Sequence, residues 1–170
     1  MKAAALLLFG AMLMILPGCN GLVNSLSFFP DRNYLVKSEN LPESVEERII
    51  ITPDGIKLQI LYFRHDKGNG KVVIYFHGNA GNLYGRIDEG SRIFSMGHDV
   101  VISGYRGYGR STGEPTEEGI YIDGRTVCDY AVDTLGYPLN KIFIYGRSIG
   151  TTVAVNVSIG MEYGGVILVT

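Results

Sequence analysis

Three short segments of the chain are almost entirely apolar, and they are separated by longer stretches of mixed polarity. They are KVVIYF at 71–76, DVVIS at 99–103 and KIFIY at 141–145. Nearly continuous apolar runs of this length are typical of parallel strands that are covered on both faces. A fourth run of the same character, GVILVT at 165–170, stands at the end of the chain. The pattern therefore predicts four strands of a buried sheet.

Two segments ahead of these runs predict an antiparallel hairpin. Residues 46–52 and 57–64 are rich in Ile, Leu and Tyr, and they flank Pro53-Asp54-Gly55. Proline fixes φ in such a turn and glycine accepts a positive φ, so the two segments can fold back on each other.

Three segments of helical length lie between the strands, at 83–96, 116–135 and 149–163. Apolar residues recur at helical spacing in the first two, and the third is mostly small and apolar, which predicts a buried helix. Strands that alternate with helices form a mostly parallel sheet with right-handed crossovers. We therefore expect an α/β fold, with an N-terminal antiparallel hairpin and helices on both faces of the sheet.

The first residues are typical of a targeting segment. Lys2 precedes an apolar run that extends to Leu16, which is shorter than the roughly 20 residues of a membrane-spanning helix. The sequence LPGC at 16–19 resembles the lipobox of bacterial lipoproteins, in which the cysteine is acylated and becomes the new N-terminus. The resemblance implies a lipidated Cys19 and a protein anchored in the bacterial cell envelope, at the periplasmic face or the outer membrane. A secretory signal or an uncleaved N-terminal anchor is the alternative.

These patterns divide the chain into a signal peptide at 1–18, a tether and lead-in at 19–44, and a folded domain at 45–170. Apolar residues make up 46% of the chain and charged residues 19%, as in an ordinary globular protein. The formal net charge of −2 gives no electrostatic reason to expect a nucleic-acid partner. The two cysteines are too few for a disulfide framework or a cysteine-rich metal site.

The pattern G-x-S-x-G occurs twice, at 109–113 and at 146–150. A nucleophilic serine needs a strand, a sharp turn and a helix around it, because this setting exposes the hydroxyl and directs free helix amides at the reacting oxygen. Ser148 has that setting. Ser111 instead precedes Glu114-Pro115, and a residue before proline is disfavoured in a helix. We therefore expect Ser148 to be the nucleophile and Ser111 to be a loop residue.

Acyl transfer also needs hydrogen-bond donors for the oxyanion that forms when the serine attacks. The backbone amide of Ile149, directly after the nucleophile, is one candidate. The backbone amide of Asn79 is the other, because strand 71–76 leads straight into the glycine-containing sequence HGNAGN at 77–82. The alternative for this sequence is an ordinary tight turn between a strand and a helix.

Three motifs in this order resemble the serine-aminopeptidase-like branch of the α/β-hydrolases: FHGNAGN at 76–82, GYRGYGRSTGEPTEEG at 104–119 and GRSIG at 146–150. FFPDR at 28–32 and TPDG at 52–55 are similar as well. The resemblance implies an acyl-enzyme hydrolase that cleaves ester, thioester or amide bonds in small acyl or peptide substrates, is often membrane-anchored and needs no cofactor or metal. Gly104 and Thr151 depart from the usual aspartate and glycine, and we expect them to affect local packing more than chemistry.

The base that should activate the serine is missing from its usual place. In this fold the acid and the histidine follow the serine in the sequence, but no aspartate or histidine follows Ser148, and Glu162 is the only later acid. Among the three upstream histidines, His77 should lie nearest to Ser148. It is either a substitute base or a residue that packs within its loop. We expect His65 to be solvated, His98 to lie in a turn and Cys128 to be a buried thiol.

The last apolar run has the composition of a strand with a neighbour on each side, so we expect an incomplete α/β-hydrolase fold with strands up to about the sixth. Three functions follow from these observations. The first is a serine hydrolase that is inactive or impaired for lack of a base. The second is a non-catalytic, membrane-anchored lipoprotein that binds a partner or ligand. The third is a minimal enzyme that uses His77.

Overall fold

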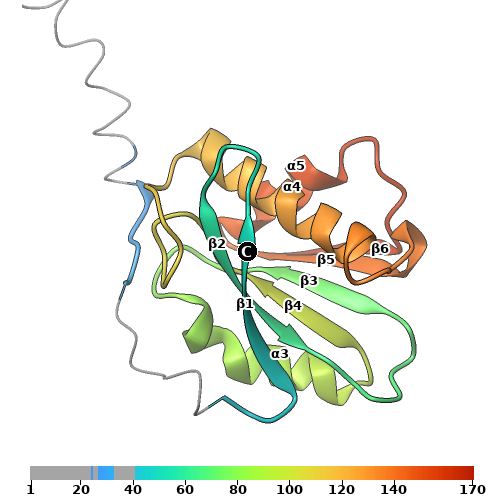
Figure 1. Cartoon of the computed structure of the whole chain (residues 1–170). Coiled ribbons are helices and arrows are strands. Elements are labelled where there is room, and N and C mark those ends of the chain that lie inside the picture. The colour runs from blue at the N-terminus through green and yellow to red at the C-terminus, as the bar shows by residue number, and fades with distance from the viewer. Residues whose placement is uncertain (1–23, 25–26, 33–40) are drawn as a thin grey trace, which may run out of the picture.

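The computed structural model describes residues 24, 27–32 and 41–170 (Figure 1). The predictions for the signal peptide at 1–18 and for lipidation at Cys19 concern residues outside this part of the chain. Within the described residues, no helix combines the length and the apolarity needed to cross a bilayer.

Six strands form one mixed sheet, in the order β1-β2-β4-β3-β5-β6. The first two pair antiparallel as the predicted hairpin, β2 also pairs antiparallel with β4, and all remaining pairs are parallel. Every predicted strand is present, with its ends within two residues of those expected. The bounds are β1 Val45–Ile51, β2 Lys57–Phe63, β3 Val72–Phe76, β4 Asp99–Ser103, β5 Ile142–Arg147 and β6 Gly165–Val169.

Helices cover both faces of the sheet, as the sequence predicts (Figure 1). One face carries η3 (Leu83–Arg86) and α3 (Ile87–Ser95), and the other carries α4 (Glu117–Asp133) and α5 (Gly150–Ser158). A further 3₁₀ turn, η4 (Leu139–Lys141), precedes β5. The helix α4 begins where the Thr116 hydroxyl accepts a hydrogen bond from the Gly119 amide at 3.0 Å, which satisfies one free donor of the first turn.

Two helix predictions need correction. The segment 83–96 is not one helix, because it begins as the 3₁₀ turn η3 before the α-helix α3. The helix predicted at 149–163 ends at Ser158, since Ile159 is extended and Gly160 has a φ of 73°. Beyond that end the chain is not buried, and the Ile159 side chain is 73% exposed.

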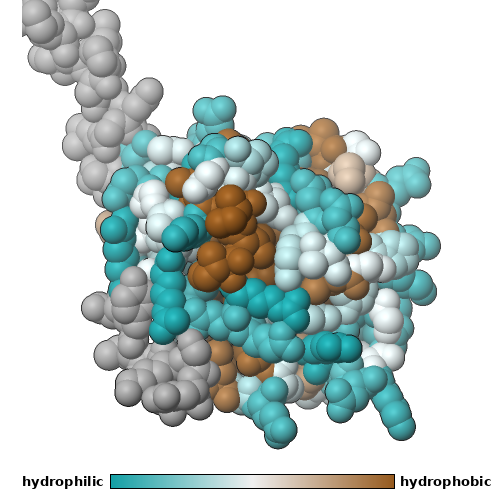
Figure 2. All heavy atoms as spheres, in the orientation of Figure 1, coloured by the Kyte–Doolittle hydropathy of each residue, from teal (hydrophilic) through white to brown (hydrophobic). Residues whose placement is uncertain are grey.

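The strands in the middle of the sheet are the core of the protein. All residues of β3 and β4 are buried, which explains their continuous apolar sequences. The edge strand β6 differs, because Val166 to Val169 are between 37% and 48% exposed. At the other edge Ile49 and Ile51 of β1 are also exposed, and Figure 2 shows hydrophobic side chains gathered over the β1–β2 hairpin.

A cluster of ion pairs, buried at Arg106 and Asp123 and exposed at Asp54, fixes the long loop between β4 and α4. The guanidinium of Arg106 donates to both carboxylate oxygens of Asp123 and also to Asp54, at distances of 2.8 to 3.2 Å. The Arg106 amide donates to Asp123 as well, at 2.8 Å. Since Asp123 is fully buried in α4, the cluster ties the loop to that helix and to the β1–β2 turn. The loop follows β4, so the cluster holds it at the carboxyl end of the parallel strands.

Candidate active site

Ser148 lies in a strained turn between the end of β5 and the start of α5. Its φ is 52°, and it is the one non-glycine residue in the described part of the chain with a positive φ. A left-handed backbone of this kind costs on the order of 1–3 kcal/mol and persists only where the surrounding structure enforces it. Ser148 is also exposed. The predicted strand, sharp turn and helix therefore surround this serine.

The two flanking glycines are required by close packing. A Cβ on Gly150 would lie 2.0 Å from the carbonyl oxygen of Phe76, so α5 can begin against the end of β3 only if this residue is glycine. A Cβ on Gly146 would lie 2.5 Å from the carbonyl oxygen of Gly150 and 2.7 Å from the Cβ of Ala154. The spacing G-x-S-x-G thus follows from the contact of the turn with β3 and α5.

The loop at 77–82 lies directly beside this turn. A Cβ built on Gly78 would be 3.4 Å from the Cβ of Ser148 and 3.7 Å from the carbonyl oxygen of Arg147. The amides of Asn79 and Ile149, proposed from the sequence as oxyanion donors, belong to these two neighbouring segments. Neither amide donates a hydrogen bond within the part of the chain that the structure describes. The arrangement leaves a free backbone donor in each of the two segments that meet at the exposed Ser148.

No family model matches the chain. It is 34% identical to the uncharacterized protein R595 of Acanthamoeba polyphaga mimivirus, over 71% of this chain and 42% of that protein. It is 38% identical to the lysophosphatidylserine lipase ABHD12 of Gallus gallus, over 56% of this chain and 26% of the lipase. An α/β-hydrolase structure from Vibrio vulnificus matches 73% of this chain and 44% of its own, with a TM-score of 0.65 and 26% identity.

The strand order, the strained serine and these similarities all point to the same fold. The chain has an α/β-hydrolase fold, and its sequence is similar to that of a lipase. It spans less than half the length of each of the three proteins just described.

The second G-x-S-x-G motif of the chain has a structural role. Ser111 is buried in the loop between β4 and α4, and its hydroxyl accepts a hydrogen bond from the amide of Gln59 at 3.0 Å. Gly109 of the same motif has a φ of 53°, and a Cβ there would lie 2.5 Å from Oε1 of Gln59. The prediction that Ser111 is a loop residue is confirmed.

His77 is the one histidine at the carboxyl end of the parallel strands. It follows β3 directly and is fully buried. Nδ1 lies 2.6 Å from the carbonyl oxygen of Gly78 and donates to it, while Nε2 has no hydrogen-bond partner among the described residues. Neither ring nitrogen is therefore hydrogen-bonded to Ser148. Burial, together with the nearby charge of Arg86, lowers the pKa of His77 to about 4, against the weaker opposing effect of the Gly78 bond.

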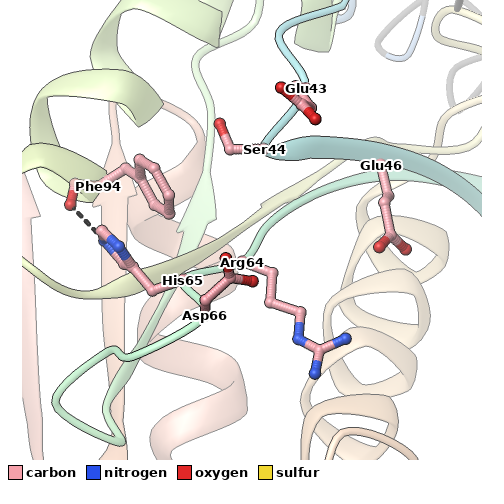
Figure 3. A pocket seen from close by; sticks show the side chains of 7 residues that line it. All are labelled: Glu43, Ser44, Glu46, Arg64, His65, Asp66 and Phe94. Atoms are coloured by element: carbon pink, nitrogen blue, oxygen red, sulfur yellow. Dashed lines mark hydrogen bonds between the residues drawn. The ribbon is translucent and has the colours of Figure 1, made fainter.

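The other two histidines lie at the opposite end of the sheet. His65 is only partly solvated, because its ring stacks on that of Phe94, with 3.7 Å between the ring centroids, and its Nε2 lies 2.7 Å from the Phe94 carbonyl oxygen (Figure 3). His98 lies just before β4, and its Nδ1 is 2.8 Å from Nδ2 of Asn69. Since Ser148 follows the carboxyl end of β5, neither histidine is placed to act on it. Figure 3 shows the open recess beside His65, lined by Glu43, Ser44, Glu46, Arg64, His65, Asp66 and Phe94.

One contact near the nucleophile was not predicted from the sequence. Glu89 of α3 accepts hydrogen bonds from Tyr75 at 2.6 Å, from Tyr145 at 2.8 Å and from Arg147 at 2.9 Å. Partial burial alone would raise the pKa of Glu89, but these three donors outweigh it and lower the pKa. The carboxylate therefore anchors Arg147, the residue before Ser148, to the helix beneath the sheet.

Two further observations concern metal binding and thiol chemistry. Within the described residues no group of three or more His, Cys, Asp or Glu side chains is arranged to hold a metal ion. Cys128 is buried in α4, and burial raises the pKa of its thiol to about 12, so the thiol is not a nucleophile at neutral pH. The prediction of a buried thiol is confirmed.

Proposed function

We propose that this chain carries the nucleophile and the oxyanion hole of a serine hydrolase that cleaves ester, thioester or amide bonds. One observation carries the proposal: an exposed serine with a left-handed backbone, between a strand and a helix, lies against the loop that supplies a second free amide. Strain of this kind is retained where it serves the reaction, since it exposes the hydroxyl above the sheet.

In the proposed reaction the Ser148 hydroxyl oxygen attacks the carbonyl carbon of the substrate and loses its proton. The carbonyl electrons move onto the oxygen, where the amides of Ile149 and Asn79 stabilise the negative charge. Each such donor is worth roughly 10²–10³ in rate. The tetrahedral intermediate then expels the alcohol, thiol or amine, which takes up a proton, and leaves an acyl-serine ester. Water attacks that ester, releases the acid and restores the serine.

We also propose that the 170-residue chain performs this reaction slowly. A serine hydroxyl is a weak nucleophile until a base accepts its proton. His77 is the histidine at the correct end of the sheet, but its Nδ1 is bonded to Gly78, its Nε2 is not bonded to Ser148, and its pKa is lowered to about 4. These properties disfavour the minimal enzyme that uses His77 as its base.

A lipid ester is the substrate class that we favour. The relative from Gallus gallus is named as a lysophosphatidylserine lipase, and the proposed acylation of Cys19 would hold this chain at a membrane surface. Ser27 is eight positions after Cys19, and eight fully extended steps of the chain span at most about 29 Å. Ser27 contacts Asn79 in the loop beside the nucleophile. An anchor at Cys19 would therefore keep Ser27, and with it the edge of the active-site loop, within about 30 Å of the bilayer.

A fluorophosphonate probe, which bonds covalently to reactive serines, tests the proposal. The purified chain should be labelled slowly and stoichiometrically, with the adduct located at Ser148 by peptide mass spectrometry. Ser148→Ala should abolish labelling. Ser111→Ala is the matched control, because it removes the serine of the second motif, and it should retain labelling once circular dichroism has shown that it is folded.

The remaining outcomes separate the alternatives. Loss of labelling in His77→Asn, with Ser148 still present, would favour the minimal enzyme. Labelling that persists in Ser148→Ala would rule out Ser148 as the nucleophile. A wild-type chain that binds lipid vesicles but is never labelled would favour a non-catalytic, membrane-anchored lipoprotein.

A further inference from the structure

Residues 27–32, here called the lead-in segment, lie against the loops that surround the candidate active site. Phe28 is buried in the hydrophobic core between the sheet and α4 and α5. Pro30 forms a parallel β-bridge with Gly81, and the carbonyl oxygen of Asp31 accepts a hydrogen bond from the amide of Gly109 at 2.9 Å. The segment that the sequence suggests is an irregular lead-in is thus packed as part of the domain.

Arg32 extends this contact to the loop between β4 and α4. Its guanidinium donates to the carbonyl oxygens of Gly107 and Gly113, each at 3.0 Å, and to the carboxylate of Glu114 at 2.8 Å. The lead-in segment therefore bridges two loops that are distant in sequence: the loop at 77–82 and the loop at 104–116.

The side chain of Asn79 is where these segments meet. Its Oδ1 accepts hydrogen bonds from the amide of Phe29 at 3.0 Å and from the hydroxyl of Tyr108 at 2.7 Å. Its Nδ2 donates to the carbonyl oxygen of Ser27 at 2.6 Å. One carboxamide thus holds the lead-in segment, the β4–α4 loop and its own loop in a single arrangement. Both acceptor positions of Oδ1 are occupied.

This arrangement matters because the backbone of the same residue is the candidate oxyanion donor. The loop contains Gly78 and Gly81, the second with a φ of 79°, and glycine gives a loop many accessible conformations. An oxyanion hole is effective only when its donors are oriented before the charge develops. A loop of this composition needs ties outside itself to keep the Asn79 amide in one orientation.

We infer that the lead-in segment is part of the catalytic apparatus: its main chain, through the carboxamide of Asn79, fixes the loop that presents the Asn79 amide to the oxyanion. The carboxamide of Asn79 then has a positioning role, because it holds the backbone amide of the same residue in place. Its effect on the reaction rests on the proposed function, whereas its effect on the conformation of the loop does not.

Asn79→Ala removes all three side-chain hydrogen bonds and keeps the backbone amide. Asn69→Ala is the matched control, because Asn69 also accepts from a backbone amide, that of Lys71, and contacts another loop, at His98, but it precedes β3 instead of following it. Tyr108→Phe removes one of the three bonds and keeps the ring.

The first measurement is the ¹⁵N order parameter of the backbone amides at 78–81, which does not depend on activity. In the wild type and in Asn69→Ala we expect values near 0.85, typical of rigid backbone, and in Asn79→Ala values below about 0.6. Tyr108→Phe should give values between these. Unchanged order parameters in Asn79→Ala would overturn the inference, because the side chain would then not fix the loop.

The second measurement is the rate constant for fluorophosphonate labelling of Ser148. Asn79→Ala should lower it at least tenfold, part of the roughly 10²–10³ that an oxyanion donor is worth, while Asn69→Ala should leave it unchanged. A mobile loop with an unchanged labelling rate would overturn the inference, since the tie would then have no effect on the oxyanion hole. If the wild type is not labelled, the proposed function fails, and the order parameters still decide whether the side chain fixes the loop.

Discussion

Acidification between pH 6.5 and 4 should destabilise this protein through His77. The imidazole is fully buried, its Nδ1 donates to Gly78, and its ring lies 4.6 Å from that of Tyr105. Burial, aided by the charge of Arg86, lowers the pKa of His77 from 6.5 to about 4. Below pH 6.5 the unfolded chain takes up a proton that the folded chain does not bind until about pH 4, so the free energy of unfolding must fall through this interval.

The size of the effect follows from the same two values. A fall in pKa from 6.5 to about 4, at about 1.4 kcal/mol for each pKa unit, corresponds to a loss of about 3 kcal/mol. The loss is absent above pH 6.5 and complete below pH 4. Asp54 acts in a different interval, because hydrogen bonds from Arg106 and Thr52 lower its pKa from 3.8 to about 2, and its contribution is lost only below pH 4.

Urea unfolding at pH 7.5 and at pH 4 measures this loss, followed by far-UV circular dichroism because the chain has no tryptophan. The test variant is His77→Asn, which keeps a donor for the Gly78 carbonyl oxygen but does not titrate in this range. The smaller side chain lowers stability equally at both pH values. Other titrating groups are common to both proteins, so the wild type should lose about 3 kcal/mol more than the variant between the two pH values. Equal losses would show that His77 is not buried in its neutral form.

Three further predictions concern the buried ion pair, the turn at Ser148 and the exposed edge of the sheet. Asp123→Asn should lower the free energy of unfolding by roughly 3 kcal/mol, because it removes a buried negative charge from Arg106; an unchanged urea midpoint would contradict this. Gly150→Ala should cost on the order of 1–3 kcal/mol and abolish probe labelling, since its Cβ would lie 2.0 Å from the Phe76 carbonyl oxygen. Full labelling of that variant would show that the turn does not need glycine. Leu168→Lys should reduce self-association in light scattering without shifting the urea midpoint, because β6 is an exposed apolar edge. Equal scattering by the variant and the wild type would show that this edge does not associate.

Most of the fold could be predicted from the sequence, because its signals are local. Continuous apolar runs mark β3 and β4 as central strands, and every residue of both is buried. The hairpin turn at Pro53-Asp54-Gly55 is equally local, since its residue types determine its backbone. The helix predictions were less accurate at their ends, where η3 precedes α3 and where Gly160 follows the end of α5. Those boundaries depend on single residues and not on a repeated pattern.

In the candidate site, too, local features could be predicted from the sequence and long-range contacts could not. The sequence by itself determined the turn at Ser148, because strand, glycines, serine and helix are adjacent in the chain and dictate one another's conformation. Only the tertiary structure decided what holds that turn and its neighbouring loop: Glu89 is 58 residues from Arg147, and Asn79 is 50 residues from Phe29. A hydrogen bond between such distant residues leaves no periodic pattern in the sequence, because its partners become neighbours only when the sheet has formed.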